Sequence, residues 1–368
     1  MNSTAPFPGQ NLSTNLTAAM MGDTTTGESF SFKAVKLSVY VLIFLVSIVG
    51  NTLVVVVIIR RRRMRTVINY FIFNLAVADL AMTCICIPFD IPVQENEYRW
   101  PYGPILCRII YPLQTMSLFA SVFTLTAVSL NRFWAIVYPL RRQMTKSVAT
   151  LAIALIWLVS GILTIPYVTV LYIDVDGICN EKWPGDEHRK AYTLGLFVCQ
   201  YVIPLTVILI AYIRIAIELR KCITSKQSVS VNSVLNKAQQ EDAKKVVRML
   251  IIVTLLFAIC VLPNNIMWLW LDYGNGIEWP HFWKTLTFTN LILFANSASN
   301  PVVYTICHER FRDEFRRYMT CDHRVFKSIQ STFSVFNFVS LQRENSEQTE
   351  TVKCVLEALL VDSRETAL

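Results

Sequence analysis

Charged residues are scarce in this sequence, and over long stretches they are almost absent. Only 16% of the 368 residues are Asp, Glu, Lys or Arg, whereas 54% are apolar and the mean hydropathy is +0.44. Between Cys107 and Arg132 the only charge is Arg108. At about 1.5 Å per residue this interval gives roughly 37 Å of helix, enough to cross a bilayer. The composition excludes a chain of ordinary soluble domains and indicates several membrane spans.

Cysteines are too sparse to form a disulfide framework. Ten occur in 368 residues, which excludes the small cysteine-stapled class of secreted proteins. A cysteine inside an apolar run is most simply interpreted as a small residue buried in the membrane. The cysteines in such runs are Cys84, Cys86, Cys199, Cys260 and Cys307.

The N-terminal residues 1–36 lack the short apolar region of a cleaved signal peptide. We therefore expect the first span to act as the signal anchor. The same residues are polar and contain three sequons, which predicts a glycosylated extracellular tail. The acceptor residues are Asn2, Asn11 and Asn15.

Seven apolar segments follow, each long enough to span a membrane. The net charge of +8 could suit a nucleic-acid partner, but the basic residues form short clusters between these segments. The clusters follow the first, third and fifth segments, while the opposite loops carry acids, which places the N-terminus outside and the C-terminus inside. The sequence thus predicts an all-α membrane protein with a seven-transmembrane helix bundle over residues 37–307. The segments lie at approximately 37–59, 69–92, 105–137, 148–172, 192–219, 246–271 and 283–307.

The chain beyond the seventh segment carries signals for the membrane surface and for partners. Residues 308–320 place two phenylalanines one turn apart among charges, which predicts a short amphipathic eighth helix on the inner membrane surface; a merely solvated helix is the alternative. Residues 321–368 form the expected cytoplasmic regulatory tail. Within it, Cys321 is a palmitoylation candidate and Thr366–Leu368 fits the motif that PDZ domains bind.

Polar side chains inside the spans point to function, because they are costly in a bilayer. Asp79 in the second segment is the clearest case and supplies the only carboxylate of a polar group at similar depth. A generic buried polar network is the alternative interpretation. The other members, from the first, third and seventh segments, are Asn51, Ser121, Asn296, Ser297 and Asn300.

Together with prolines in later spans and the run Asn300–Pro301–Val302–Val303–Tyr304, these residues resemble the rhodopsin-like G protein-coupled receptors over roughly residues 37–320. The resemblance implies a receptor, not an enzyme, that couples ligand binding to a heterotrimeric G protein, with arrestin as a further partner. It implies an allosteric sodium ion at Asp79 and no other cofactor. It also implies a disulfide between Cys107 and Cys179, both in an oxidising compartment. The implied coupling and activation residues are Asn131, Arg132, Phe133, Tyr212, Phe257, Pro263, Asn300, Pro301 and Tyr304.

Three positions depart from the pattern of the family. Asn131 replaces the acid that usually precedes Arg132, Ala243 lies where many relatives carry a second acid, and Val261 replaces a tryptophan. Because a neutral amide lacks charge assistance, we expect a weaker restraint on Arg132 and measurable signalling without ligand. The opposing interpretation is a receptor that couples poorly.

The resemblance also narrows the ligand. Gln114 lies where amine receptors carry an aspartate, and Phe294 lies where opsins carry the retinal lysine, so both classes are excluded. The chain resembles receptors for amidated neuropeptides of the RFamide, neuropeptide Y and orexin branch, in which two acids meet a peptide arginine. Solvated loop charges are the alternative. The expected ligand-binding residues are Gln114, Glu181, Asp272, Asp90 and Asn290.

The sequence therefore predicts a receptor for a neuropeptide that is amidated and contains arginine. A non-signalling scavenger of the same fold is the alternative, consistent with the altered triplet at Arg132. A transporter ranks third, because paired segments broken by Gly or Pro in two matching halves are missing.

Overall fold

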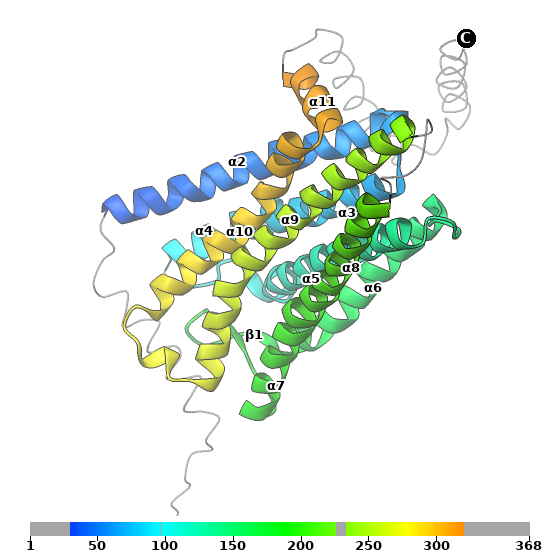
Figure 1. The fold of residues 1–368 in the computed structure, drawn as a ribbon. Helices are drawn as coiled ribbons and strands as arrows, with labels where there is room; N and C mark the ends of the chain where they lie inside the picture. The colour runs from blue at the N-terminus through cyan, green and yellow to red at the C-terminus, as the bar shows by residue number, and fades with distance from the viewer. Residues whose placement is uncertain (1–29, 97, 226–232, 320–368) are drawn as a thin grey trace, which may run out of the picture. The chain divides into compact units, whose positions relative to one another are not determined.

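The computed structural model describes residues 30–96, 98–225 and 233–319, most of them helical (Figure 1). The chain divides into two units, Met1–Arg312 and Asp313–Leu368. The first contains a bundle of helices, and the second is described only as far as residue 319. The predicted glycosylation, palmitoylation and PDZ-binding residues lie outside the described ranges: Asn2, Asn11, Asn15, Cys321 and Thr366–Leu368.

Each predicted apolar segment forms one helix or two helices in series. Thr66 and Thr145 begin two of them, because each side chain accepts a hydrogen bond from a backbone N–H of the first turn. Short π-helical turns, Met82–Cys86 and Val198–Val202, divide the second and fifth segments. The seven segments correspond to α2 (Phe30–Arg60), α3 (Val67–Ala81) with α4 (Ile87–Glu95), α5 (Gly103–Val137), α6 (Lys146–Val170), α7 (Asp186–Phe197) with α8 (Ile203–Ser225), α9 (Ser233–Tyr273) and α10 (Phe282–Cys307).

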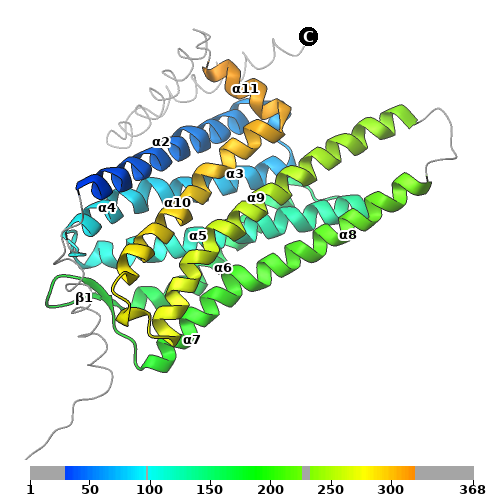
Figure 2. The same ribbon diagram turned by 60° about the vertical axis from the view of Figure 1, so that its left-hand side comes forward.

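Helix α5 is the centre of the bundle. It contacts α3, α6, α8 and α9, while α10 packs against both α2 and α9. Figure 2 shows the same order, with α10 running between α2 and α9. Cys107 lies near the start of α5 and Arg132 near its other end. We call the end of the bundle near Cys107 the hairpin end, after the β-hairpin described below, and the end near Arg132 the arginine end.

Six of the seven segments in the described ranges are both long and apolar enough to cross a membrane: α2, α3 with α4, α5, α6, α7 with α8, and α9. Helix α10 has the length, since its 26 residues give roughly 39 Å. It is less apolar because Asn296, Ser297 and Asn300 lie in its middle, all buried. Its neighbours on both sides shield these groups from lipid.

The fourth helix ends earlier than predicted. We expected it to reach residue 172, but α6 ends at Val170 and the chain turns into strand β1 (Leu171–Ile173). This strand pairs in antiparallel fashion with β2 (Cys179–Glu181). The pairing satisfies backbone groups that a helix end would leave open, so the hairpin replaces the last helical turn.

The hairpin turn is stabilised by one aspartate side chain and one glycine. Asp174 Oδ1 accepts hydrogen bonds from the backbone N–H groups of Asp176 and Ile178. Gly177 has φ +78°, a conformation that glycine adopts readily. The hairpin is therefore a built element of the loop after α6, which the sequence pattern had left without structure.

A last helix, α11 (Glu309–Met319), matches the predicted helix over 308–320 within one residue at each end. Its position on a membrane surface stays a prediction.

Candidate ligand and coupling sites

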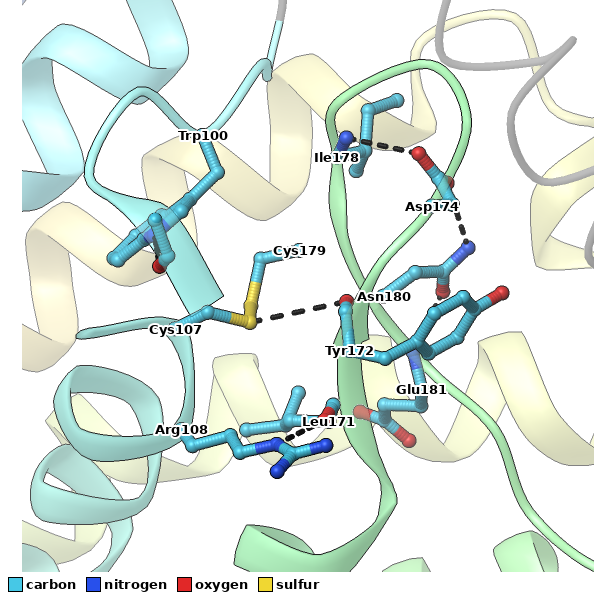
Figure 3. The surroundings of a disulfide bond; sticks show 11 residues. Trp100, Cys107, Arg108, Leu171, Tyr172, Asp174, Ile178, Cys179, Asn180 and Glu181 are labelled. Carbon is cyan, nitrogen blue, oxygen red and sulfur yellow. Dashed lines mark hydrogen bonds between the residues drawn. A yellow bond between two sulfur atoms is a disulfide. The ribbon is translucent and has the colours of Figure 1, made fainter. Parts of the chain in front are cut away.

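The β-hairpin is fastened to the start of α5. The predicted disulfide between Cys107 and Cys179 is present, with the two Cα atoms 5.8 Å apart (Figure 3). Beside it, Arg108 Nε donates a hydrogen bond to the backbone oxygen of Leu171 at 2.8 Å. On the other side, the backbone N–H of Trp100 donates to the hairpin turn at 2.8 Å. These links fix β2, and with it Glu181, at the hairpin end.

The two acids predicted to meet a ligand arginine lie close enough to interact with each other. Asp272, at the end of α9, is 3% exposed in its side chain and pairs with Arg189 of α7, Nη2 to Oδ1, at 3.2 Å. Glu181 accepts a hydrogen bond from Trp183 Nε1 at 2.6 Å. Burial raises the pKa of the Glu181 carboxyl, and repulsion from Asp272 adds to this, although the bond from Trp183 and attraction to Arg189 oppose it. Neither acid is a freely solvated loop charge.

Aromatic rings stand beside Glu181. The ring centroids of Trp183 and Tyr192 are 5.1 Å apart, and those of Tyr192 and Tyr167 are 6.2 Å apart. Tyr167 is also near enough to Glu181 for the two side chains to interact. A carboxylate with aromatic rings nearby suits a cation, because the charge attracts it and a ring face can do so as well.

Sequence reasoning missed Arg189 and the tyrosines of this site. The available signal was weak, because Arg189 lies just before the fifth segment in a loop that contains both acids and lysines.

The remaining predicted ligand residues lie in other settings. Asp90 Oδ2 accepts hydrogen bonds from Tyr40 at 3.1 Å and from Gln94 at 2.7 Å. Asn290 on α10 accepts one from an asparagine of α9, and Gln114 is half-buried on α5. Within the described ranges, no hydrogen bond or ion pair joins these three residues to Glu181 or Asp272. The structure thus brings two of the five predicted residues together.

A second polar group surrounds Asp79, which is 1% exposed. Asn300 Nδ2 donates to Asp79 Oδ2 at 2.8 Å. Asn51 Nδ2 bridges to the backbone oxygen of Ser297 at 3.0 Å. All six predicted residues are buried: Asn51, Asp79, Ser121, Asn296, Ser297 and Asn300.

Three amide oxygens in this group have no hydrogen-bond partner in the described part of the chain: Oδ1 of Asn51, of Asn296 and of Asn300. Buried polar atoms are normally satisfied, so unpaired oxygens beside a carboxylate call for a donor or a cation. Carboxylate and amide oxygens are the ligands that hard cations prefer. The residues present therefore fit a sodium ion.

At the arginine end, Arg132 bonds to its neutral neighbour. Its Nη2 donates to Asn131 Oδ1 at 3.1 Å, and its Nε is buried with no hydrogen-bond partner among the described residues. Nearby, Ser129 Oγ donates to the hydroxyl of Tyr212 at 2.9 Å, which links α5 to α8. The expected weak restraint on the arginine therefore has a structural counterpart in one hydrogen bond to a neutral acceptor.

The other predicted coupling residues occupy the body of the bundle. Phe257 is buried on α9, as is Val261, while Tyr304 is buried on α10 with its ring 5.8 Å from that of Phe311. The ring of Phe133 lies edge-on to a neighbouring tyrosine at 6.0 Å. Pro263 lies inside α9 and Pro301 inside α10.

One ion pair at this end was not expected from the sequence. Lys245 Nζ of α9 lies 3.0 Å from Glu309 Oε1, just after α10. Both side chains are more than half exposed, so solvent screens the pair. It joins the sixth segment to the chain after the seventh, and Lys245 lies two residues beyond Ala243, the position where many relatives carry a second acid.

Comparison with known proteins agrees with this geometry. The family described as 7 transmembrane receptor (rhodopsin family) matches residues 50–304. The chain is 35% identical over 308 residues to a "QRFP-like peptide receptor" of Branchiostoma floridae, covering 78% of each chain. It is 30% identical to a "RYamide receptor" of Tribolium castaneum, covering 84% of this chain and 87% of the relative. It is 34% identical to "Neuropeptide FF receptor 2" of Rattus norvegicus, covering 79% and 74%.

Proposed function

The chain belongs to the rhodopsin family of seven-transmembrane receptors, and from this premise we propose that it is a G protein-coupled receptor for an amidated, arginine-containing neuropeptide. Its hairpin end faces the outside of the plasma membrane and receives the peptide. Its arginine end faces the cytoplasm and binds the G protein. The basic clusters next to the arginine end support this orientation.

The observation that carries the ligand class is the pair of acids at the hairpin end. Glu181 and Asp272 come from separate elements, and the surrounding protein holds both against aromatic or cationic side chains. A guanidinium makes two parallel hydrogen bonds to a carboxylate and stacks on aromatic faces, so arginine fits this site better than lysine. The relatives named above are receptors for peptides, one of them for an RYamide.

Signalling follows from the difference in ligand affinity between two arrangements of the bundle. The peptide binds where α7 begins and α9 ends, and the other end of α9 reaches the arginine end, where it carries Lys245. We assign Asp79 and its buried oxygens to a sodium ion that stabilises the arrangement without peptide. Opening the arginine end then requires release of Arg132 from Asn131 and separation of Lys245 from Glu309.

The test is G protein activation in cells that express the full chain, with a synthetic peptide ending in Arg-Phe-amide and its Arg-to-Ala analogue. Neutralising Asp272 with Asp272→Asn should weaken the arginine peptide by about 2–5 kcal/mol, as for a buried charge pair. Asp186→Asn, which changes an exposed acid of α7, is the matched control. On Asp272→Asn, the alanine analogue should lose little further affinity.

Additive losses from receptor and peptide changes would mean that the two charges do not meet. Peptide binding without G protein activation at any concentration would instead favour the scavenger interpretation.

A further inference from the structure

The acid expected to receive the ligand arginine already holds an arginine of the receptor. Arg189 and Asp272 are 16% and 3% exposed in their side chains, so the pair is largely shielded from water. Arg189 Nη2 already bonds to Asp272 Oδ1 at 3.2 Å, so a ligand guanidinium that bonds to both carboxylate oxygens must compete with it. A peptide arginine that takes both oxygens of this carboxylate therefore displaces Arg189.

The internal pair is incomplete. Arg189 makes one contact to Asp272, and its Nε is buried without a hydrogen-bond partner among the described residues. A guanidinium that approaches a carboxylate squarely makes two parallel N–H···O bonds, which is the stronger arrangement. A ligand arginine free to adopt that geometry can therefore replace Arg189 at Asp272.

Arg189 has a second acid to turn to. Glu181 interacts electrostatically with both Arg189 and Asp272. Among the described residues, its carboxylate accepts a hydrogen bond from the uncharged ring of Trp183 and has no ion-pair partner within salt-bridge distance. When a peptide arginine arrives, the site then contains two guanidinium groups and two carboxylates. Each charge retains a partner throughout, so no buried charge is left unpaired.

The helices do not depend on this pair alone for their contact. The hydroxyl of Tyr273, next to Asp272, donates to the backbone oxygen of Lys190, next to Arg189, at 2.9 Å. This hydrogen bond joins α7 to α9 independently of the ion pair. Arg189 can therefore leave Asp272 without separating the two helix ends.

We propose that Arg189 is an internal substitute for the ligand arginine, which the peptide displaces from Asp272 and which then pairs with Glu181. The proposal rests on the proposed function, because it takes a guanidinium-bearing peptide as ligand. It makes Arg189 a determinant of specificity: a peptide without a cation at this position cannot open the pair. It also predicts that Arg189 lowers the affinity of the correct ligand by competing with it.

The experiment measures binding to the full-length receptor of two synthetic amidated peptides that end in Arg-Phe-amide and in citrulline-Phe-amide. Citrulline has nearly the shape of arginine without its charge. If the pair is open about a tenth of the time, Arg189→Gln should raise affinity for the arginine peptide about tenfold. It should leave the citrulline peptide nearly unchanged. Arg189→Lys, which keeps an internal cation, is the matched control and should bind like the wild type.

Arg189→Gln leaves Asp272 without its partner, so the double variant Arg189→Gln/Asp272→Asn guards against misfolding. It should reach the cell surface and bind both peptides equally. If Arg189 merely positions Asp272, Arg189→Gln will lower the preference for arginine over citrulline. The proposed exchange, in which the peptide arginine displaces Arg189 from Asp272, is then wrong. A wild type that prefers arginine, with no change in Arg189→Gln, would overturn the exchange alone. A wild type that binds both peptides equally would overturn the proposed arginine recognition and the exchange with it.

Discussion

The substitution Asn131→Asp should reduce signalling in the absence of ligand. In the structure, the guanidinium of Arg132 bonds to the neutral amide of Asn131 at 3.1 Å, and Arg132 Nε has no hydrogen-bond partner among the described residues. An aspartate at 131 would convert this bond, from a charged donor to a neutral acceptor, into an ion pair in which both partners are charged. The carboxylate would add its own attraction for the guanidinium to the hydrogen bond.

The size of the effect follows from this one bond. The existing bond already involves one charged group, and such bonds contribute about 1.5–3 kcal/mol net. A carboxylate at 131 adds charge attraction to this, and its own desolvation takes back part of the gain. A net restraint of about 1 kcal/mol on the inactive arrangement changes the active fraction about five-fold. Asn131→Ala removes the acceptor and should shift the active fraction in the opposite direction.

The assay is basal G protein activation at matched surface levels for three receptors: wild type, Asn131→Asp and Asn131→Ala. The expected order of basal activity is Ala above wild type above Asp. Equal activity in all three would show that this bond does not restrain the arginine, and the reasoning from the altered triplet would be wrong.

Three further outcomes are expected. Asp79→Asn should abolish the effect of sodium on agonist affinity, measured by binding in sodium and in a large organic cation; an unchanged sodium response would refute the assignment. Cys179→Ser should sharply reduce surface expression or peptide binding, because the hairpin loses its link to α5; free thiols at this position in the mature surface protein would contradict the prediction. Gly50→Ala should destabilise the receptor by about 1–3 kcal/mol, because the new methyl group would lie 2.6 Å from Pro301 Cβ. Thermal unfolding measures this, with Gly161→Ala as the control that meets only ordinary contacts.

Much of the bundle was predictable because membrane spans obey length and polarity rules that act locally. Every predicted segment is helical in the structure, and the departures are the π-helical turns inside the second and fifth segments and the positions of the helix ends. The fourth segment stops at Val170 because Leu171 pairs across the hairpin with Glu181. Such pairing depends on residues distant along the chain, which no local pattern of apolar residues reports.

The residues of the candidate sites also fall into two groups, those that local sequence predicts and those that only the fold reveals. Asp79 stands out from sequence because a carboxylate inside an apolar run is costly. The residues predicted to surround it are all buried in the structure. Arg189 does not stand out, because an arginine near a loop looks solvated until the fold brings Asp272 beside it. Lys245 and Glu309 illustrate the same point, since each is an ordinary surface charge until the fold places them 3.0 Å apart.

The polarity of α10 has a consequence for how the protein is made. Its middle carries Asn296, Ser297 and Asn300, so it is the one bundle helix that falls short of the hydropathy expected of a span in the described ranges. Entry into the lipid phase becomes less favourable with each polar side chain at the helix centre. Because α10 is the last helix of the bundle to leave the ribosome, α2 and α9 are already available to shield those groups when it arrives. Helix α10 therefore enters the membrane late in biosynthesis and with help from α2 and α9. Substitutions in either of these helices should disturb the membrane orientation of the C-terminal part of the chain.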